Sequence, residues 1–134
     1  MLFRSTNQAQ SDMNSYKSNN IRSVKLRTFE RDGTESDGFF CERKISKDFK
    51  KSSLYTRTPI NGISLMESYF SEKGQLIRTY DSTDIAIKII LYSYYENGRL
   101  ASAIMSTRSN DDDYVNEQTE TRSEEHTSEL PVTQ

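Results

Sequence analysis

A short stretch in the second half of the chain constrains the fold more than any other feature. Residues 85–95 read IAIKIILYSYY, and residues 99–107 form a second β-rich run. Between them stands Asn97-Gly98, the dipeptide most typical of a tight β-hairpin, for which we expect a type I′ turn with positive φ at both central residues. Apolar side chains fall on both faces of the strand expected over 85–95, which predicts a central strand covered at least partly on each side.

A similar hairpin is expected just before it, from residues 63–70 and 75–80. Four positions agree between the two hairpins at a spacing of 24 residues: Phe70, Glu72, Gly74 and Leu76 correspond to Tyr94, Glu96, Gly98 and Leu100. Because one hairpin alone is marginal in water, we expect these repeat-like units, near 63–81 and 85–107, to pair edge to edge. Two independent hairpins that share generic turn chemistry remain the alternative.

Weaker β signals complete the pattern. In the first of them, Val24 and Leu26 share one face, as a half-buried strand requires. Asp32-Gly33 predicts a turn after that strand, and Pro59 ends a later one. The further expected strands are residues 21–30, 39–45, 54–58 and 114–121. We therefore expect a mostly β fold: an antiparallel meander of β-hairpins over residues 21–121, with disordered termini.

The two ends differ in composition from this body. Residues 1–20 are rich in Asn, Ser and Gln and are expected to be a disordered N-terminus; the remnant of a signal peptide, with its exit near Ala9, is an equal alternative. Residues 122–134 resemble a translated sequencing adapter and are treated as an artefactual, disordered tail. The formal net charge of −2 is that of this tail, with Arg122 against three glutamates, so residues 1–121 are neutral.

At SYFSEKGQLIRTYD and YSYYENGRLASAI, over residues 67–107, the chain resembles the tyrosine-aspartate (YD) repeats of RHS and teneurin proteins. It departs from that pattern because Glu72 and Glu96 lie two residues after the aromatic residue, where the family has Asp directly after Tyr. YYENGRL is also similar to the opening of MORN repeats, although a second glycine-containing half is missing. Both resemblances imply β-hairpin arrays that scaffold or bind, with no catalytic residues of their own.

Catalytic chemistry is tested by elimination. The one histidine, His126, lies in the adapter-like tail, so residues 1–121 have no imidazole for a triad, a general base or a zinc site. Cys41 lacks a histidine partner and is expected to be structural. Asn110 and the following run Asp111–Asp113 lack the spacing of a calcium loop. Glu72 and Glu96 fit turn positions better than a catalytic pair. We expect no catalytic, cofactor-binding or metal-binding residues, and no cofactor.

Several features bear on partners. A basic stretch interrupted by Glu42 and Asp48 favours a soluble surface over a nucleic-acid track, and the apolar run 85–95 is too short to span a membrane. Edge strand 99–107 is expected to lack a neighbour and to promote self-association. The basic residues are Arg43, Lys44, Lys47, Lys50 and Lys51, and the tyrosines that could form a sugar-stacking face are Tyr69, Tyr80, Tyr92, Tyr94 and Tyr95.

Together these patterns indicate a non-enzymatic scaffold or binding fragment of a repeat-containing bacterial protein. We expect the sheet surface to bind protein or carbohydrate, and we expect a secreted, periplasmic or cell-envelope location. Two alternatives stay open. One is a truncated piece of an enzyme whose catalytic domain is missing, and the other is a small intracellular MORN-like partner protein.

Overall fold

The fold is a single antiparallel sheet with one helix packed against it, as seen in a computed structural model that describes residues 2–109 and 115–121. Eight strands follow one another in the sheet in sequence order, so every neighbouring pair is joined directly along the chain. The strands are β1 (Ser23–Leu26), β2 (Phe40–Ile45), β3 (Lys51–Thr58), β4 (Gly62–Phe70), β5 (Leu76–Thr83), β6 (Ala86–Tyr94), β7 (Leu100–Ser109) and β8 (Val115–Thr121). The expected mostly β, antiparallel meander is confirmed.

Strand boundaries differ from expectation mainly in the first half. β1 is shorter than the expected strand over 21–30, and both Val24 and Leu26 are exposed, because α1 does not cover them. β3 begins at Lys51, three residues before the expected strand over 54–58. The tail 122–134 and the acidic run 110–113 lie outside the described residues.

The expected open edge at residues 99–107 is wrong. β7 pairs along its length with β8, with Ser102 opposite Thr121 and Arg108 opposite Val115. The edges of the described sheet are therefore β1 and β8. Ala101 and Ala103 of β7 are both buried, so a lysine there would disrupt the core instead of guarding an edge.

The hairpin turns also correct the expected type I′ geometry. At the second hairpin only Gly98 has a positive φ, and the Gly98 N–H donates to the Tyr95 carbonyl at 2.9 Å. The hairpin therefore has a three-residue loop, a type I turn followed by a glycine in the left-handed region, which is the next most common solution after the primed two-residue turns. The first hairpin has the same arrangement: Gly74 has a positive φ, and its N–H donates to the Ser71 carbonyl at 2.9 Å.

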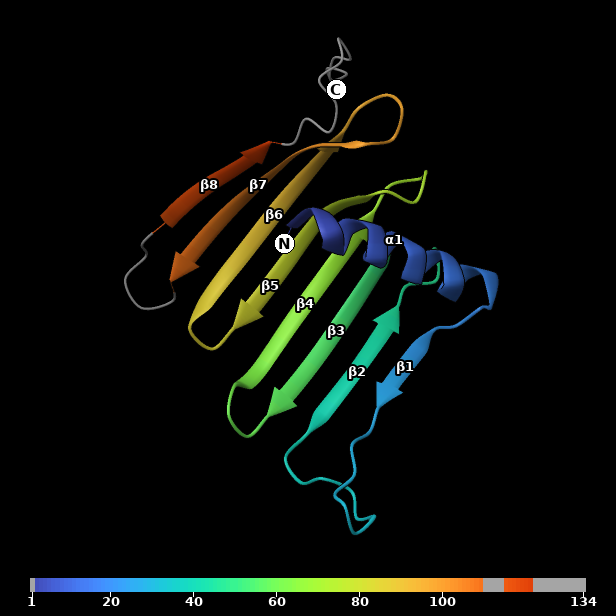
Figure 1. Cartoon of the computed structure of the whole chain (residues 1–134), viewed down its shortest axis with the longest axis vertical. Coiled ribbons are helices and arrows are strands. Elements are labelled where there is room, and N and C mark those ends of the chain that lie inside the picture. The colour runs from blue at the N-terminus through green and yellow to red at the C-terminus, as the bar shows by residue number, and fades with distance from the viewer. Residues whose placement is uncertain (1, 110–114, 122–134) are drawn as a thin grey trace.

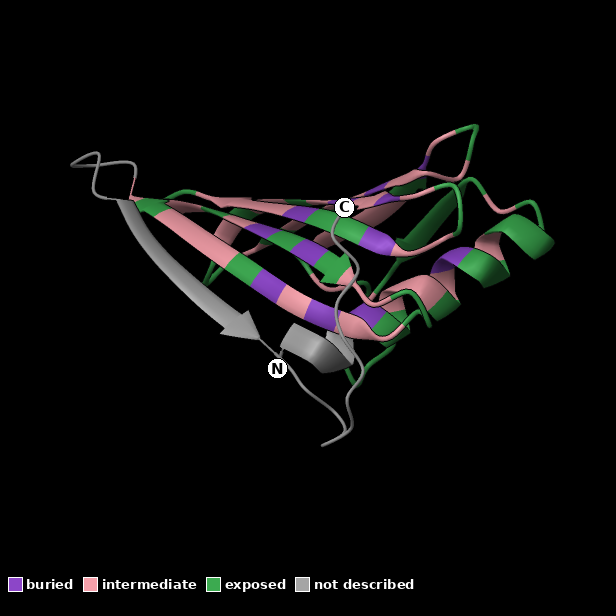
Figure 2. Ribbon diagram, turned by 90° about the horizontal axis from the view of Figure 1, so that it is seen from above, coloured by how far each residue is buried: buried purple, intermediate pink, exposed green. Residues whose placement is uncertain are grey.

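Residues 2–18 form helix α1 (Leu2–Ser18), so the expected disordered N-terminus is wrong for this segment. Figure 1 shows α1 crossing the strands near one end of the sheet, and Figure 2 shows the sheet curving around it. The helix stops in a Schellman motif: Asn20 has φ 54°, and the Ile21 N–H donates to the Tyr16 carbonyl at 2.8 Å. Tertiary packing explains why so polar a segment is helical.

The core lies between α1 and the face of the sheet that it covers, here called the helix face. Thr6, Ala9, Met13 and Tyr16 recur at helical spacing, and Thr6 and Met13 are buried. From the sheet come Ile45, Phe70, Leu76, Ile90, Tyr92 and Ala103. The opposite face, here called the outer face, is covered by no described element.

Candidate functional site

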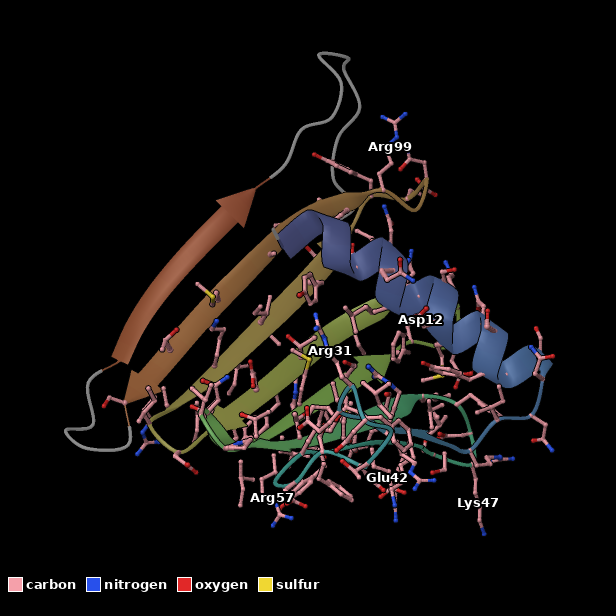
Figure 3. The ribbon with its side chains drawn as sticks, turned by 60° about the horizontal axis from the view of Figure 1, so that its bottom comes forward. Asp12, Arg31, Glu42, Lys47, Arg57 and Arg99 are labelled. Atoms are coloured by element: carbon pink, nitrogen blue, oxygen red, sulfur yellow. The ribbon has the colours of Figure 1, made fainter. Side chains whose placement is uncertain are left out.

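A cavity of about 200 Å³ lies between α1 and the helix face of strands β2, β3 and β4. We call it the helix–sheet cavity. Its roof is one face of α1, where the contributing positions 8, 9, 12, 13 and 16 follow helical spacing. Figure 3 shows the helix lying over the strands, with Asp12 labelled on it.

The wall of the cavity consists of two buried apolar side chains and two that are partly exposed to solvent. Met13 of α1 and Phe70 of β4 are both buried, and they belong to the core cluster. Tyr16 is partly buried, and Met66 is exposed enough to stand at the mouth of the cavity. An apolar ligand group would therefore reach a dry surface next to the core.

The floor of the cavity is polar, because Arg43, Ser52 and Ser68 follow one another across three strands. Ser52 stands directly opposite Ser68, and Arg43 lies one step along the sheet from Ser52 on the same face. The Arg43 guanidinium donates from Nη1 to the Ser52 hydroxyl at 2.7 Å. Both serines are buried, which places two hydroxyl groups beside a guanidinium at the base of a cavity.

Arg43 has uncharged neighbours on the sheet. Val24 stands opposite it on β1 and Leu54 on β3, while Cys41 and Ile45 are the next residues on the same face of β2. Within the described residues, Arg43 makes no ion pair with a carboxylate. A guanidinium placed among apolar side chains retains donors for an acceptor from outside the chain.

A single carboxylate contributes to the helix side of the cavity. Asp12 accepts a hydrogen bond from the Gln8 side chain at 2.8 Å, and both residues line the cavity. Asp12 is therefore oriented by its own helix, one turn from its partner, and forms no salt bridge with Arg43. The cavity thus has positive charge on its sheet side and negative charge on its helix side.

The helix is joined to the sheet by a polar contact at Gln10. Its side-chain oxygen accepts hydrogen bonds from the Leu76 backbone N–H at 2.8 Å and from the Tyr94 hydroxyl at 3.0 Å. The same hydroxyl donates to the Leu76 carbonyl. Burial, and secondarily the neighbouring Tyr92, raises the pKa of the Tyr94 phenol well above its ordinary value. The contact fixes α1 over the cavity.

The basic stretch expected near residues 43–51 does not form one surface. Arg43 lies in the cavity, while Lys51 lies on the outer face and pairs with Glu67 at 2.8 Å. The hydrogen bond from Lys51 lowers the pKa of Glu67, and Lys50 pairs with Glu72 at the turn. Arg43 and Lys51 therefore lie on opposite faces of the sheet.

The tyrosines do not share a face either. Tyr69 and Tyr80 lie on the outer face, Tyr92 is buried in the core, and Tyr94 contacts the helix. Tyr69 is flanked by Lys51 and Arg78, whose charged groups lie 5.5 and 4.6 Å from its ring centre. A continuous sugar-stacking surface therefore finds no support in these four side chains.

Other sequence candidates occupy separate positions. Cys41 is a free, partly buried thiol on β2, and its Sγ accepts a hydrogen bond from Thr56 at 3.9 Å. Glu72 and Glu96 stand at equivalent places in two different turns. Over residues 2–109 and 115–121 no group of three potential metal ligands occurs, and no described helix is long and apolar enough to cross a membrane.

Comparisons with known proteins add no relative. A scan against protein-family models, a search of curated proteins and a search of solved structures each gave no significant match.

The helix–sheet cavity was missed by the sequence reasoning. Its roof belongs to the segment that was expected to be disordered, and its floor needs the register between β2, β3 and β4. One signal was present: Arg43 alternates with Cys41 and Ile45, which places a charge on an otherwise neutral strand face.

Proposed function

We propose that the chain is a non-enzymatic binding module that holds a small molecule in the helix–sheet cavity. The observation that carries this proposal is the composition of the cavity: a polar floor of Arg43, Ser52 and Ser68 beneath an apolar wall of Met13 and Phe70. Ligand pockets in proteins combine a mostly apolar lining with a few polar groups that fix orientation.

The partners of the polar groups favour binding over catalysis. A serine nucleophile needs an adjacent base to take its proton. Ser52 instead accepts a hydrogen bond from Arg43, and a guanidinium does not accept protons in proteins. Asp12 is turned toward Gln8 of its own helix. The described lining therefore offers recognition of a charged or polar group but no activated nucleophile.

The volume limits the size of the ligand. An apolar cavity of roughly 150 Å³ holds a benzene molecule. At about 200 Å³, the helix–sheet cavity has room for one aromatic ring, or an aliphatic group of similar size, together with a small polar head. Larger ligands would have to extend from the mouth beside Met66.

A neutral probe tests the proposal. Titrating 3-phenylpropanol into isotope-labelled protein should shift the amide signals of Met13, Ser52, Ser68 and Phe70 in a saturable way. Ala9→Phe places a ring in the roof of the cavity and should abolish the shifts, because it fills the space. Ser11→Phe, on the exposed side of the same helix, is the matched control and should leave binding intact.

If Ala9→Phe and the wild-type chain respond alike, the ligand does not enter the cavity and the proposed function is wrong. A circular dichroism melt of each variant excludes unfolding as the reason for lost binding. Loss of binding in Ser11→Phe as well as Ala9→Phe would show a general effect on α1, and it too would contradict the proposal.

Scaffolding is a second candidate function, favoured by the outer face of the sheet. Tyr55, Ile63, Leu91 and Ile104 are exposed there, and exposed apolar patches mark interaction surfaces. The proposed occupant is a second copy of this chain, which light scattering after size-exclusion chromatography would detect. Leu91→Lys should then restore the monomer, whereas Ser11→Lys should not; a monomeric wild-type chain would contradict this candidate.

From the resemblance to YD repeats we propose that such a module belongs to a secreted or cell-envelope repeat protein. The two hairpins support this proposal by their matching turns, bulge positions and spacing of 24 residues. The sequence of the whole gene would distinguish this proposal from the alternatives. Further repeats and a signal peptide would support it, a downstream catalytic domain would favour an enzyme fragment, and a compact intracellular frame would favour a MORN-like partner protein.

A further inference from the structure

The helix–sheet cavity has a charge asymmetry that limits the chemistry of its ligand. Arg43 stands on the sheet side, where its register neighbours are Val24 and Leu54 and its guanidinium donates to the uncharged Ser52 hydroxyl. A guanidinium presents its donors in a planar fork that matches a carboxylate, and this pairing is stronger than one with a neutral acceptor.

We infer that the ligand of the helix–sheet cavity carries a carboxylate, which binds Arg43 and the hydroxyl groups of Ser52 and Ser68, attached to one ring-sized apolar group that packs on Met13 and Phe70. This inference rests on the proposed function. The two serines are buried, so their hydroxyl groups gain more from an acceptor in the cavity than they would at a wet surface.

The position of Asp12 sets the orientation of such a ligand. Its carboxylate lies on the helix side and is held by Gln8. An acid bound the other way round would bring two negative charges together in a partly dry site, which is unfavourable. The carboxylate end therefore faces the sheet, and the apolar end lies between Met13 and Phe70.

A matched series of probes tests the inference: 3-phenylpropionate, 3-phenylpropanol and 3-phenylpropylamine share one ring and one chain. Nuclear magnetic resonance titration of the whole chain should show the acid binding at least about tenfold more tightly than the alcohol, as expected for hydrogen bonds to a charged group. The amine should bind most weakly, because Arg43 repels it.

Variants assign the effect to residues. Arg43→Met keeps an unbranched side chain but removes the charge and the donors, and it should reduce binding of the acid to the level of the alcohol. Arg57→Met is the matched control, because Arg57 is an exposed arginine of the outer face that points away from the helix in Figure 3. Asp12→Asn can keep the hydrogen bond from Gln8, removes a like charge and should tighten binding of the acid.

Each result of these titrations supports or overturns the carboxylate inference. Equal binding of acid and alcohol, with both lost in Ala9→Phe, would overturn the carboxylate inference and leave the proposed function standing. Tighter binding of the amine would assign recognition to Asp12 and overturn the inference. Failure of all three probes to bind at millimolar concentration would overturn both the inference and the proposed function. An acid whose affinity survives Arg43→Met, with the fold confirmed by circular dichroism, would also overturn it.

Discussion

Two hairpins of this chain have the same turn but different surroundings. In both, an N–H of a left-handed glycine closes a type I turn, at Gly74 and at Gly98, and both pairs of strands shift register at the bulge next to it. The bulged residues are Ile77 and Ala101, again 24 residues apart. Local geometry is therefore set by the turn residues and not by what packs on the hairpin.

The surroundings differ in how far matching positions of the two hairpins are buried. Leu76, next to the first turn, is 1% exposed, whereas Leu100 at the matching position is only partly buried. The bulged Ile77 is exposed and the bulged Ala101 is buried. A shared motif can thus serve two different roles, which means that likeness of sequence between the hairpins does not predict likeness of energetic contribution.

A third turn tests whether the shared geometry of the Gly74 and Gly98 turns is evidence for a sequence repeat. Gly33 donates to the Glu30 carbonyl at 3.0 Å in the same arrangement, with the isolated bridge Phe29–Glu35 beyond it. An aromatic residue precedes the glycine by four positions here also. This turn lies outside the proposed repeat, so the turn geometry by itself does not require common descent of the other two hairpins.

The largest contrast is expected on truncating the two leucines. Leu76→Ala should lower the free energy of unfolding by about 2–5 kcal/mol, since it removes a fully buried side chain and leaves a cavity beside the core. Leu100→Ala should cost clearly less, because that leucine is only partly buried. Urea denaturation of both variants measures the difference; equal losses would contradict the asymmetry between the hairpins.

Sequence patterns found the sheet but not what covers it. Asn97-Gly98, with β-rich runs on both sides, was sufficient to predict the β6–β7 hairpin, because turn and strand signals are local. The helix was missed because its sheet-facing positions Thr6, Ala9, Met13 and Tyr16 supply only a weak apolar stripe. Such a stripe becomes informative only when a sheet with a matching open face is known.

The same distinction explains the misjudged edge and the missed cavity. The sequence predicts a strand at residues 114–121, but it does not show that this strand pairs with β7, so β7 was expected to be an edge without its partner β8. Arg43 was grouped with its lysine neighbours along the sequence, although alternation separates it from Lys44. Pairing between strands is not a local property, and it decides both points.

The next largest effect concerns the link that α1 makes to both hairpins. Gln10→Leu removes the acceptor of the Leu76 N–H and one of the two acceptors near the Tyr94 hydroxyl, and should cost about 1–3 kcal/mol because the Leu76 N–H is left unpaired. Hydrogen exchange at the Leu76 amide should accelerate. Gln8→Leu is the control, because its side-chain amide donates to Asp12 of the same helix and not to the sheet; similar losses in both variants would disprove the link.

Valine at the turn glycines should give a smaller and more uniform effect. Gly74→Val and Gly98→Val should each destabilise the chain by about 1 kcal/mol or more, because a β-branched residue resists positive φ. Space is not the cause: an added Cβ would meet nothing within 4 Å at Gly98 and only Asn14, at 3.7 Å, at Gly74. Thermal melts of the pair test this, and an effect at only one glycine would show that the turns are not equivalent.

The smallest effect is a pH dependence confined to the second hairpin, since Tyr94 has a hydroxyl group and its counterpart Phe70 does not. Burial raises the pKa of Tyr94 in the folded chain, so the stabilisation it provides is complete below the ordinary value of about 10 and is lost as the pH rises above it. At pH 10.5 the loss should stay under about 1 kcal/mol, because the unfolded chain is only half a unit past that value.

Tyr94→Phe isolates this effect from the other groups that titrate at high pH. At pH 8 the variant should be less stable than the wild type, because it lacks the hydrogen bonds to Gln10 and Leu76. Between pH 9 and 11 (measured by urea denaturation at each pH) the gap should narrow, because only the wild type can lose a proton at this position. A constant gap would mean that Tyr94 titrates normally in the folded chain, and that the helix does not shield its hydroxyl from water.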